Sequence, residues 1–102
     1  MEQLGNLQLA AQILLIRGDM GAADKAYQAA VSYYASALSH AEAAEDQLLQ
    51  AEICHHMGNA MSAVQDEEGA RKNWSRAQRM YGDRHPEDAA ALRESLRESG
   101  AA

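Results

Sequence analysis

The pattern of apolar and polar positions along the chain predicts five α-helices, at about residues 3–23, 27–44, 46–64, 67–81 and 86–99. Within these segments apolar residues recur at intervals of three and four, which places them on one face of a helix. Pro86 suits the first turn of the last helix, because proline lacks the backbone N–H that a first turn leaves unbonded. The polar stretch "YGDRH" before it predicts a turn.

The boundary between the first two helices has an alternative. The stretch "RGDMG", residues 17–21, also has the composition of a Gly-Asp turn, which would end the first helix near Arg17 and begin the second near Met20. Apolar residues continue at spacings of three and four from Met20 to Ala41, so this longer second helix is physically reasonable. We prefer the boundary at residues 24–26, because it agrees with an internal repeat.

Composition narrows the fold class to all-α. Apolar residues make up 47% of the 102 residues, but many are alanine, and the chain has no Phe, two Val and a single Trp. Strands favour β-branched and aromatic residues, whereas alanine is the best helix former and lets helices approach closely. A chain of this length predicts one domain, residues 1–102.

An internal repeat of 40 residues supports this helix assignment. Shifting the sequence by 40 places Gly18 on Gly58 and Tyr34 on Trp74, and it also aligns three alanines and one isoleucine of the first half with their counterparts in the second. The residues that share these positions are small, or large and aromatic, as expected where two helices pack together.

These positions resemble the signature of the tetratricopeptide repeat, which has a small residue in the first helix of each unit and an alanine, aromatic, alanine series in the second. The segments "YQAAVSYYASAL" and "MGNAMSAVQDEEGARKNWSRA" carry the match. The usual period is about 34 residues, so the 40-residue offset is similar to the longer-helix type found in kinesin light chains. The signature positions are Gly18, Ala30, Tyr34, Ala37, Gly58, Ala70, Trp74 and Ala77.

The resemblance implies an antiparallel helix-hairpin α-solenoid of two repeats, residues 4–44 and 46–81, with a capping helix at 86–99. It also implies a non-enzymatic scaffold that binds a peptide or protein partner in a groove lined by the first helix of each repeat. Carried onto this sequence, the groove positions are Glu52, His55, Asn59 and Ser62, with Gln12, Leu15 and Asp19 on the first helix. Because Glu52 and Asp19 are acidic, the expected ligand is neutral or basic.

A second function remains open, in which the chain associates with itself or forms part of a longer repeat array. Two repeats are fewer than the three or so that a solenoid usually needs. Moreover, the first helix is apolar on more than one face, with Ile13, Leu15 and Ile16 outside the stripe that faces the second helix. Such an excess of apolar surface is typical of a protein contact.

The charge balance disfavours other classes of partner. Nine basic and fifteen acidic residues give a net charge of −6, which opposes binding to nucleic acid or to anionic lipid. No apolar run is long enough for a membrane span, and the N-terminus lacks a signal-peptide pattern. The single cysteine, Cys54, cannot form an intrachain disulfide and fits a reducing compartment, so the expected location is the cytoplasm.

The sequence offers no convincing catalytic, cofactor or metal site. Cys54, His55 and His56 are consecutive, so on a helix they point in three directions and cannot hold one ion. Glu52 and His55 have the Glu-x-x-His spacing of di-iron bundles, but there is no second copy of that motif. We therefore expect no bound metal or cofactor, and we expect Cys54 to be a buried apolar residue.

Overall fold

The computed structural model describes residues 3–100, so residues 1, 2, 101 and 102 of the predicted domain lie outside the described part. Five α-helices form the fold, and none of the described residues lies in a strand. The helices are α1 (Gln3–Ala23), α2 (Tyr27–Ala43), α3 (Gln47–Ala63), α4 (Glu67–Tyr81) and α5 (Pro86–Gly100), with a short 3₁₀ helix, η1 (Gly82–Arg84), before α5.

Every predicted helix is confirmed, with ends that differ by one residue at most. The alternative turn at residues 17–21 is wrong, because α1 continues through Gly18 to Ala23.

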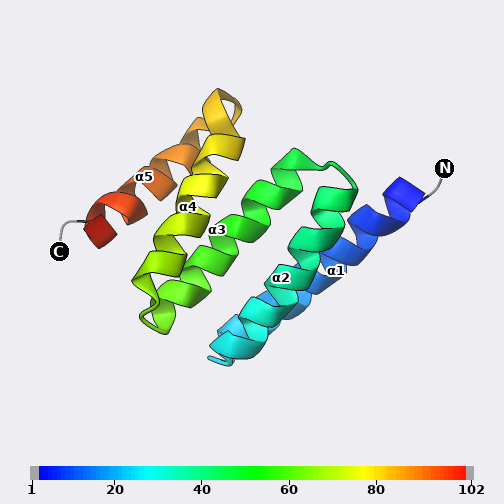
Figure 1. Ribbon diagram of the computed structural model, residues 1–102, viewed down its shortest axis with the longest axis horizontal. Coiled ribbons are helices and arrows are strands. Elements are labelled where there is room, and N and C mark those ends of the chain that lie inside the picture. Colours follow the sequence, from blue (N-terminus) through cyan, green and yellow to red (C-terminus); the bar gives the residue numbers. More distant parts are fainter. Residues whose placement is uncertain (1–2, 101–102) are drawn as a thin grey trace.

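Each helix packs against the next along the chain, so that the helices form adjacent pairs in a thin, elongated molecule of 47 × 32 × 18 Å. The α1–α2 pair lies at one end and α5 at the other (Figure 1). Helix α3 lies between α2 and α4 and also reaches α1. Within residues 3–100, no helix is both long enough and apolar enough to cross a membrane.

Three turns of the same geometry connect the first four helices. Lys25, Glu45 and Gln65 adopt left-handed backbone conformations, with φ of 64°, 56° and 66°, and they are spaced by 20 residues. The amide that follows each of them donates to the carbonyl five residues earlier, as in a Schellman motif. The fold thus advances in steps of one helix and one turn, and two steps make the 40-residue repeat.

The residue after each left-handed position is the N-cap of the following helix, and two of these three residues make a side-chain capping bond. Asp46 accepts from the amide of Leu49 at 3.0 Å, and Asp66 accepts from the amide of Gly69 at 3.0 Å. These bonds satisfy amides that the first turn of a helix leaves free. Ala26 has the same position before α2 but has no side-chain acceptor.

The signature residues pack as pairs of a small residue against a ring. A Cβ atom added to Gly58 would lie 2.5 Å from Cδ1 of Trp74, and one added to Gly18 would overlap the ring of Tyr34. Both rings are buried, and the four signature alanines are completely buried. The same contact therefore occurs at both places that the 40-residue repeat aligns.

Two apolar clusters form the core, and α3 contributes to both. Leu49, Ile53, Met57 and Ala60 of α3 join the cluster with α1 and α2, while Ala51 and Cys54 join the cluster with α4 and α5. Cys54 is completely buried, as expected, and burial raises the pKa of its thiol. Helix α5 covers the end of the second cluster with Ala89 and Leu92.

Candidate functional site

The predicted groove residues lie on α1 and α3 with different exposures. On α3, Glu52 and Asn59 are exposed, whereas His55 and Ser62 are half-buried. On α1, Gln12 is exposed and Asp19 is half-buried, but Leu15 packs against the first apolar cluster. The structure brings Asp19 into direct contact with α3, whereas Gln12 makes no side-chain hydrogen bond with the described residues.

Asp19 is the point where three helices meet. Its Oδ1 accepts a hydrogen bond from the hydroxyl of Tyr34 on α2 at 2.6 Å and lies 2.7 Å from Nδ1 of His56 on α3. Burial raises the pKa of Tyr34, as does its bond to Asp19, so the hydroxyl stays protonated and donates at neutral pH. The sequence analysis placed Asp19 in the groove but did not include its partner His56.

A hollow of about 280 Å³ opens beside this contact. Side chains from α1, α2 and α3 line it: Asp19, Ala22, Tyr27, Tyr34, His56, Asn59, Ala60 and Ala63. The alanines leave space between the helices. The half-buried rings of Tyr27 and His56 and the carboxylate of Asp19 provide groups that bind through a π face or by a hydrogen bond. The hollow is therefore suited to an extended side chain rather than to a large cofactor.

A row of rings continues from this hollow across the molecule. The rings of Tyr34, His56, His55, Tyr81 and His85 follow one another edge to face, with centroids 5.7 to 6.1 Å apart. The hydroxyl of Tyr81 and Nδ1 of His55 are 3.5 Å apart. The row links α2, α3, α4 and the residue before α5. The predicted groove residue His55 is therefore flanked by the rings of His56 and Tyr81.

The charges along this row depend on burial. Burial lowers the pKa of His55, and the nearby His56 lowers it further, so His55 is neutral at physiological pH. Partial desolvation of the Glu52 carboxyl raises its pKa although most of the residue is exposed, and the nearby His56 opposes that shift. The pKa shifts of His55 and Glu52 thus both disfavour the charged form of the side chain.

One part of the Asn59 side chain is already engaged within the fold. An asparagine amide has a carbonyl acceptor and an amino donor. In the structure Oδ1 accepts a hydrogen bond from Nε1 of Trp74 at 3.0 Å. A buried indole N–H needs such an acceptor, so Asn59 offers a ligand mainly its amino group.

The cysteine and the two histidines point in three directions, as predicted. Cys54 lies in the second apolar cluster, His55 faces Tyr81, and His56 faces Asp19. Within the described part of the chain, no three His, Cys, Asp or Glu side chains gather closely enough to share an ion.

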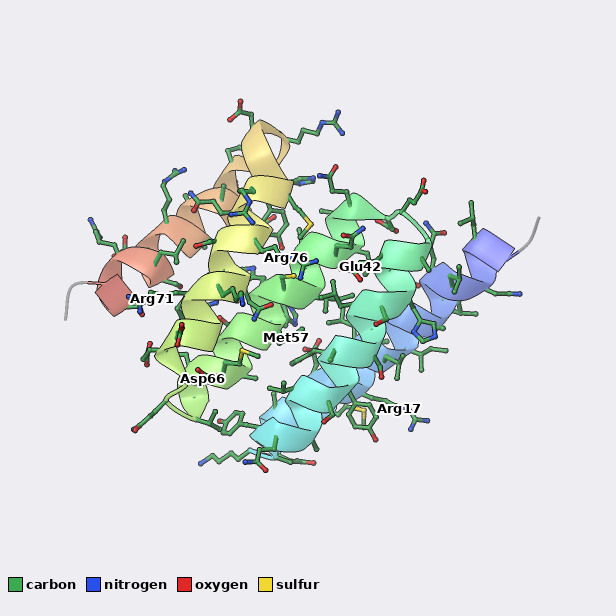
Figure 2. All side chains as sticks on the ribbon, in the orientation of Figure 1. Arg17, Glu42, Met57, Asp66, Arg71 and Arg76 are labelled. Carbon is green, nitrogen blue, oxygen red and sulfur yellow. The ribbon has the colours of Figure 1, made fainter. Side chains whose placement is uncertain are left out.

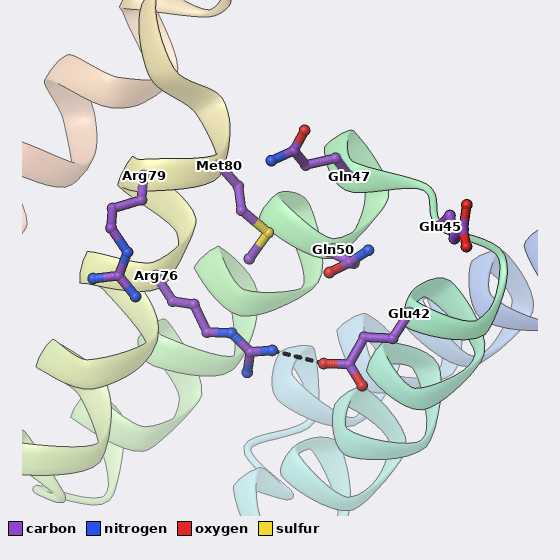
Figure 3. A pocket seen from close by; sticks show the side chains of 7 residues that line it. All are labelled: Glu42, Glu45, Gln47, Gln50, Arg76, Arg79 and Met80. Atoms are coloured by element: carbon purple, nitrogen blue, oxygen red, sulfur yellow. Dashed lines mark hydrogen bonds and ion pairs between the residues drawn. The ribbon is translucent and has the colours of Figure 1, made fainter.

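A second hollow, which the sequence analysis did not predict, lies where α2 and α4 flank the start of α3 (Figure 3). Its volume is about 530 Å³, and its lining is mostly charged and amide side chains. Arg76 of α4 and Glu42 of α2, both labelled in Figure 2, form an ion pair of 2.6 Å here, and Figure 3 shows them pointing toward each other. Both partners are partly exposed, so the pair adds little stability.

Comparisons with known proteins found no relative of this chain. No family model matches the chain, and no curated protein or solved structure matches it.

Proposed function

We propose that the chain is a non-enzymatic scaffold of tetratricopeptide type, which binds a peptide or protein segment along α1 and α3. The repeated contact of a glycine with an aromatic ring, between α1 and α2 and again between α3 and α4, supports two stacked repeats. The position of α5, with Ala89 and Leu92 buried, supports its role as the capping helix. Its outward side chains, Arg93, Glu94, Arg97 and Glu98, are all exposed.

The hollow beside Asp19 is the observation that carries the proposal. It lies between the first helices of the two proposed repeats, and the predicted groove residues Asp19 and Asn59 are both in its lining. Both hydrogen bonds to Asp19 use Oδ1, so Oδ2 is not engaged by any described residue. That oxygen is available to a donor on a ligand.

The ligand chemistry that fits is a lysine or arginine side chain within an otherwise neutral segment. The carboxylate of Asp19 attracts a cation, and the half-buried ring of Tyr27 offers an aromatic face to its alkyl stem or charged end. The chain's net charge of −6 favours the approach of a basic segment.

A peptide array tests this proposal. Peptides of random sequence are probed with the protein, and those that bind are measured by titration, with the fluorescence of Trp74 as a reporter because its indole bonds to the groove residue Asn59. We expect lysine and arginine to be enriched among the binders. Asp19→Asn should weaken their binding about tenfold, the loss of one charge-assisted hydrogen bond.

The matched control is Glu68→Gln, which removes the same charge at an exposed position of α4. It should change the affinity less than twofold, apart from a small effect of net charge. Binders without basic residues, or equal losses in the two variants, would refute the role of Asp19. An array with no binders at all would refute the groove.

A further inference from the structure

The outer face of α1 carries a stripe of exposed apolar side chains. Leu9, Ile13, Ile16 and Met20 are 55%, 46%, 57% and 62% exposed. Their spacing of four, three and four places them on one side of the helix, away from the stripe that faces α2. An aligned group of large aliphatic side chains in water is a marker of a protein contact rather than an ordinary surface.

The internal repeat shows what kind of surface covers such a stripe. Forty residues later, the same four positions on α3 are Leu49, Ile53, His56 and Ala60. Three of them are buried in the cluster with α2, and the ring of His56 lies against Tyr34 of that helix. On α3 this stripe is therefore the contact with a neighbouring helix, whereas on α1 the same positions are left exposed by residues 3–100.

The spacing of the stripe also makes it complementary to itself. Because four, three, four reads the same in both directions, two copies of α1 can pack antiparallel about a twofold axis midway between Ile13 and Ile16. In that arrangement Leu9 faces Met20 of the second copy, and Ile13 faces Ile16 of the second copy. Such pairing is isologous, the commonest way in which identical chains associate.

Charge favours a second copy as the occupant. Within Gln3–Ala23 the charged residues are Arg17 and Asp19, so this helix has no net charge although the whole chain carries −6. Two copies that meet along α1 therefore bring together their least repulsive surfaces. We propose that the stripe Leu9, Ile13, Ile16 and Met20 forms a twofold, antiparallel contact between two copies of this chain.

The contact is small, which sets the strength of the dimer. Four side chains bury less than the roughly 800 Å² per partner of a standard interface, so we expect a Kd on the order of 100 µM. Sedimentation equilibrium between about 5 µM and 1 mM brackets that value. The average mass should rise from the 11.1 kDa of one chain toward twice that value.

Two substitutions separate this contact from a general effect of charge. Ile16→Glu should weaken the dimer at least tenfold and leave the helical circular dichroism unchanged, because its side chain is outside the monomer core. Leu48→Glu introduces the same change at an exposed leucine of α3 and should leave the dimer intact. A mass that stays at one chain throughout the range, or equal effects of both variants, would overturn the proposal.

Cross-linking tests the antiparallel register. A mixture of Leu9→Cys and Met20→Cys should form a mixed disulfide under mild oxidation, because the two positions face each other. Leu9→Cys alone should cross-link at least tenfold more slowly, since its two copies would be about 16 Å apart along the helix axis, at 1.5 Å per residue. Equal rates would contradict this register, and the unmodified chain, whose Cys54 is buried, serves as the control.

Discussion

Replacing Gly58 by alanine should destabilise the fold, although alanine is the better helix former. Gly58 lies in the middle of α3, where its missing side chain allows Trp74 of α4 to approach. A Cβ atom there would be 2.5 Å from Cδ1 and 2.6 Å from Nε1 of the indole. Ordinary contacts between carbon atoms are about 3.5–4.0 Å, so the ring must move by about 1 Å.

The magnitude follows from three contributions. Helix propensity favours alanine by about 1 kcal/mol. Overpacking of a closely packed core costs roughly 1–3 kcal/mol. Movement of the ring also strains the hydrogen bond from Trp74 to Asn59, which is worth about 0.5–1.5 kcal/mol. The free energy of unfolding should therefore fall by about 1–3 kcal/mol, equivalent to a decrease in Tm of roughly 5–20 °C.

Thermal and urea unfolding followed by circular dichroism measure this change, and Gly5 supplies the control. Gly5 is also helical, but a Cβ atom there would meet nothing within 4 Å. Gly5→Ala should therefore leave the stability unchanged or raise it by a few tenths of a kcal/mol, since the residue is close to the end of α1. If Gly58→Ala raised the Tm as well, the close approach of α3 and α4 would be refuted.

Three other substitutions test different parts of the structure by unfolding. Ala26→Asp should stabilise the protein by about 1 kcal/mol, because it adds the N-cap that Asp46 and Asp66 provide at the equivalent turns; no gain would contradict the equivalence of the turns. Trp74→Ala should cost about 3–5 kcal/mol by removing a buried ring, and a Tm within a few degrees of the parent would exclude it from the core. The lowered pKa of His55 means that the unfolded state takes up its proton first, so stability should fall as the pH decreases below about 6.5. His55→Gln should reduce that fall, and an unaltered pH profile would show that burial of the imidazole does not contribute.

The helices could be predicted from the sequence because the residues that pack between helices recur at regular spacings along the chain. Alanines, glycines and rings at spacings of three and four mark the buried faces, and the 40-residue repeat favoured a boundary at residues 24–26 over a turn at Gly18. Glycine, the usual signal of a helix end, is absent at the ends of α1, α2 and α3. Lys25, Glu45 and Gln65 occupy the left-handed positions there. Periodicity located these turns where residue preferences could not.

The chemistry of the candidate site was harder to predict because it depends on distant contacts. Asp19 is 15 residues from Tyr34 and 37 from His56, and nothing local in the sequence indicates that these three side chains share one oxygen. A stripe drawn through Glu52 and Asn59 can include either His55 or His56, since both are near it on the helix. The repeat carried a partial signal, because His56 aligns with the apolar Ile16 and Ala60 with the apolar Met20. That alignment places His56 on an otherwise apolar side of α3 together with Leu49, Ile53 and Ala60.

The repeat also explains why α1 can carry two separate surfaces. On α3 one side packs against α2 and another against α4. Among residues 3–100, α1 packs mainly against α2 and makes a smaller contact with α3. At 100° per residue, Asp19 lies about a quarter turn from the centre of the stripe formed by Leu9, Ile13, Ile16 and Met20. A second copy packed on that stripe would therefore leave the hollow beside Asp19 open. Asp19→Asn and Ile16→Glu, three residues apart on one helix, should thus affect ligand binding and self-association independently.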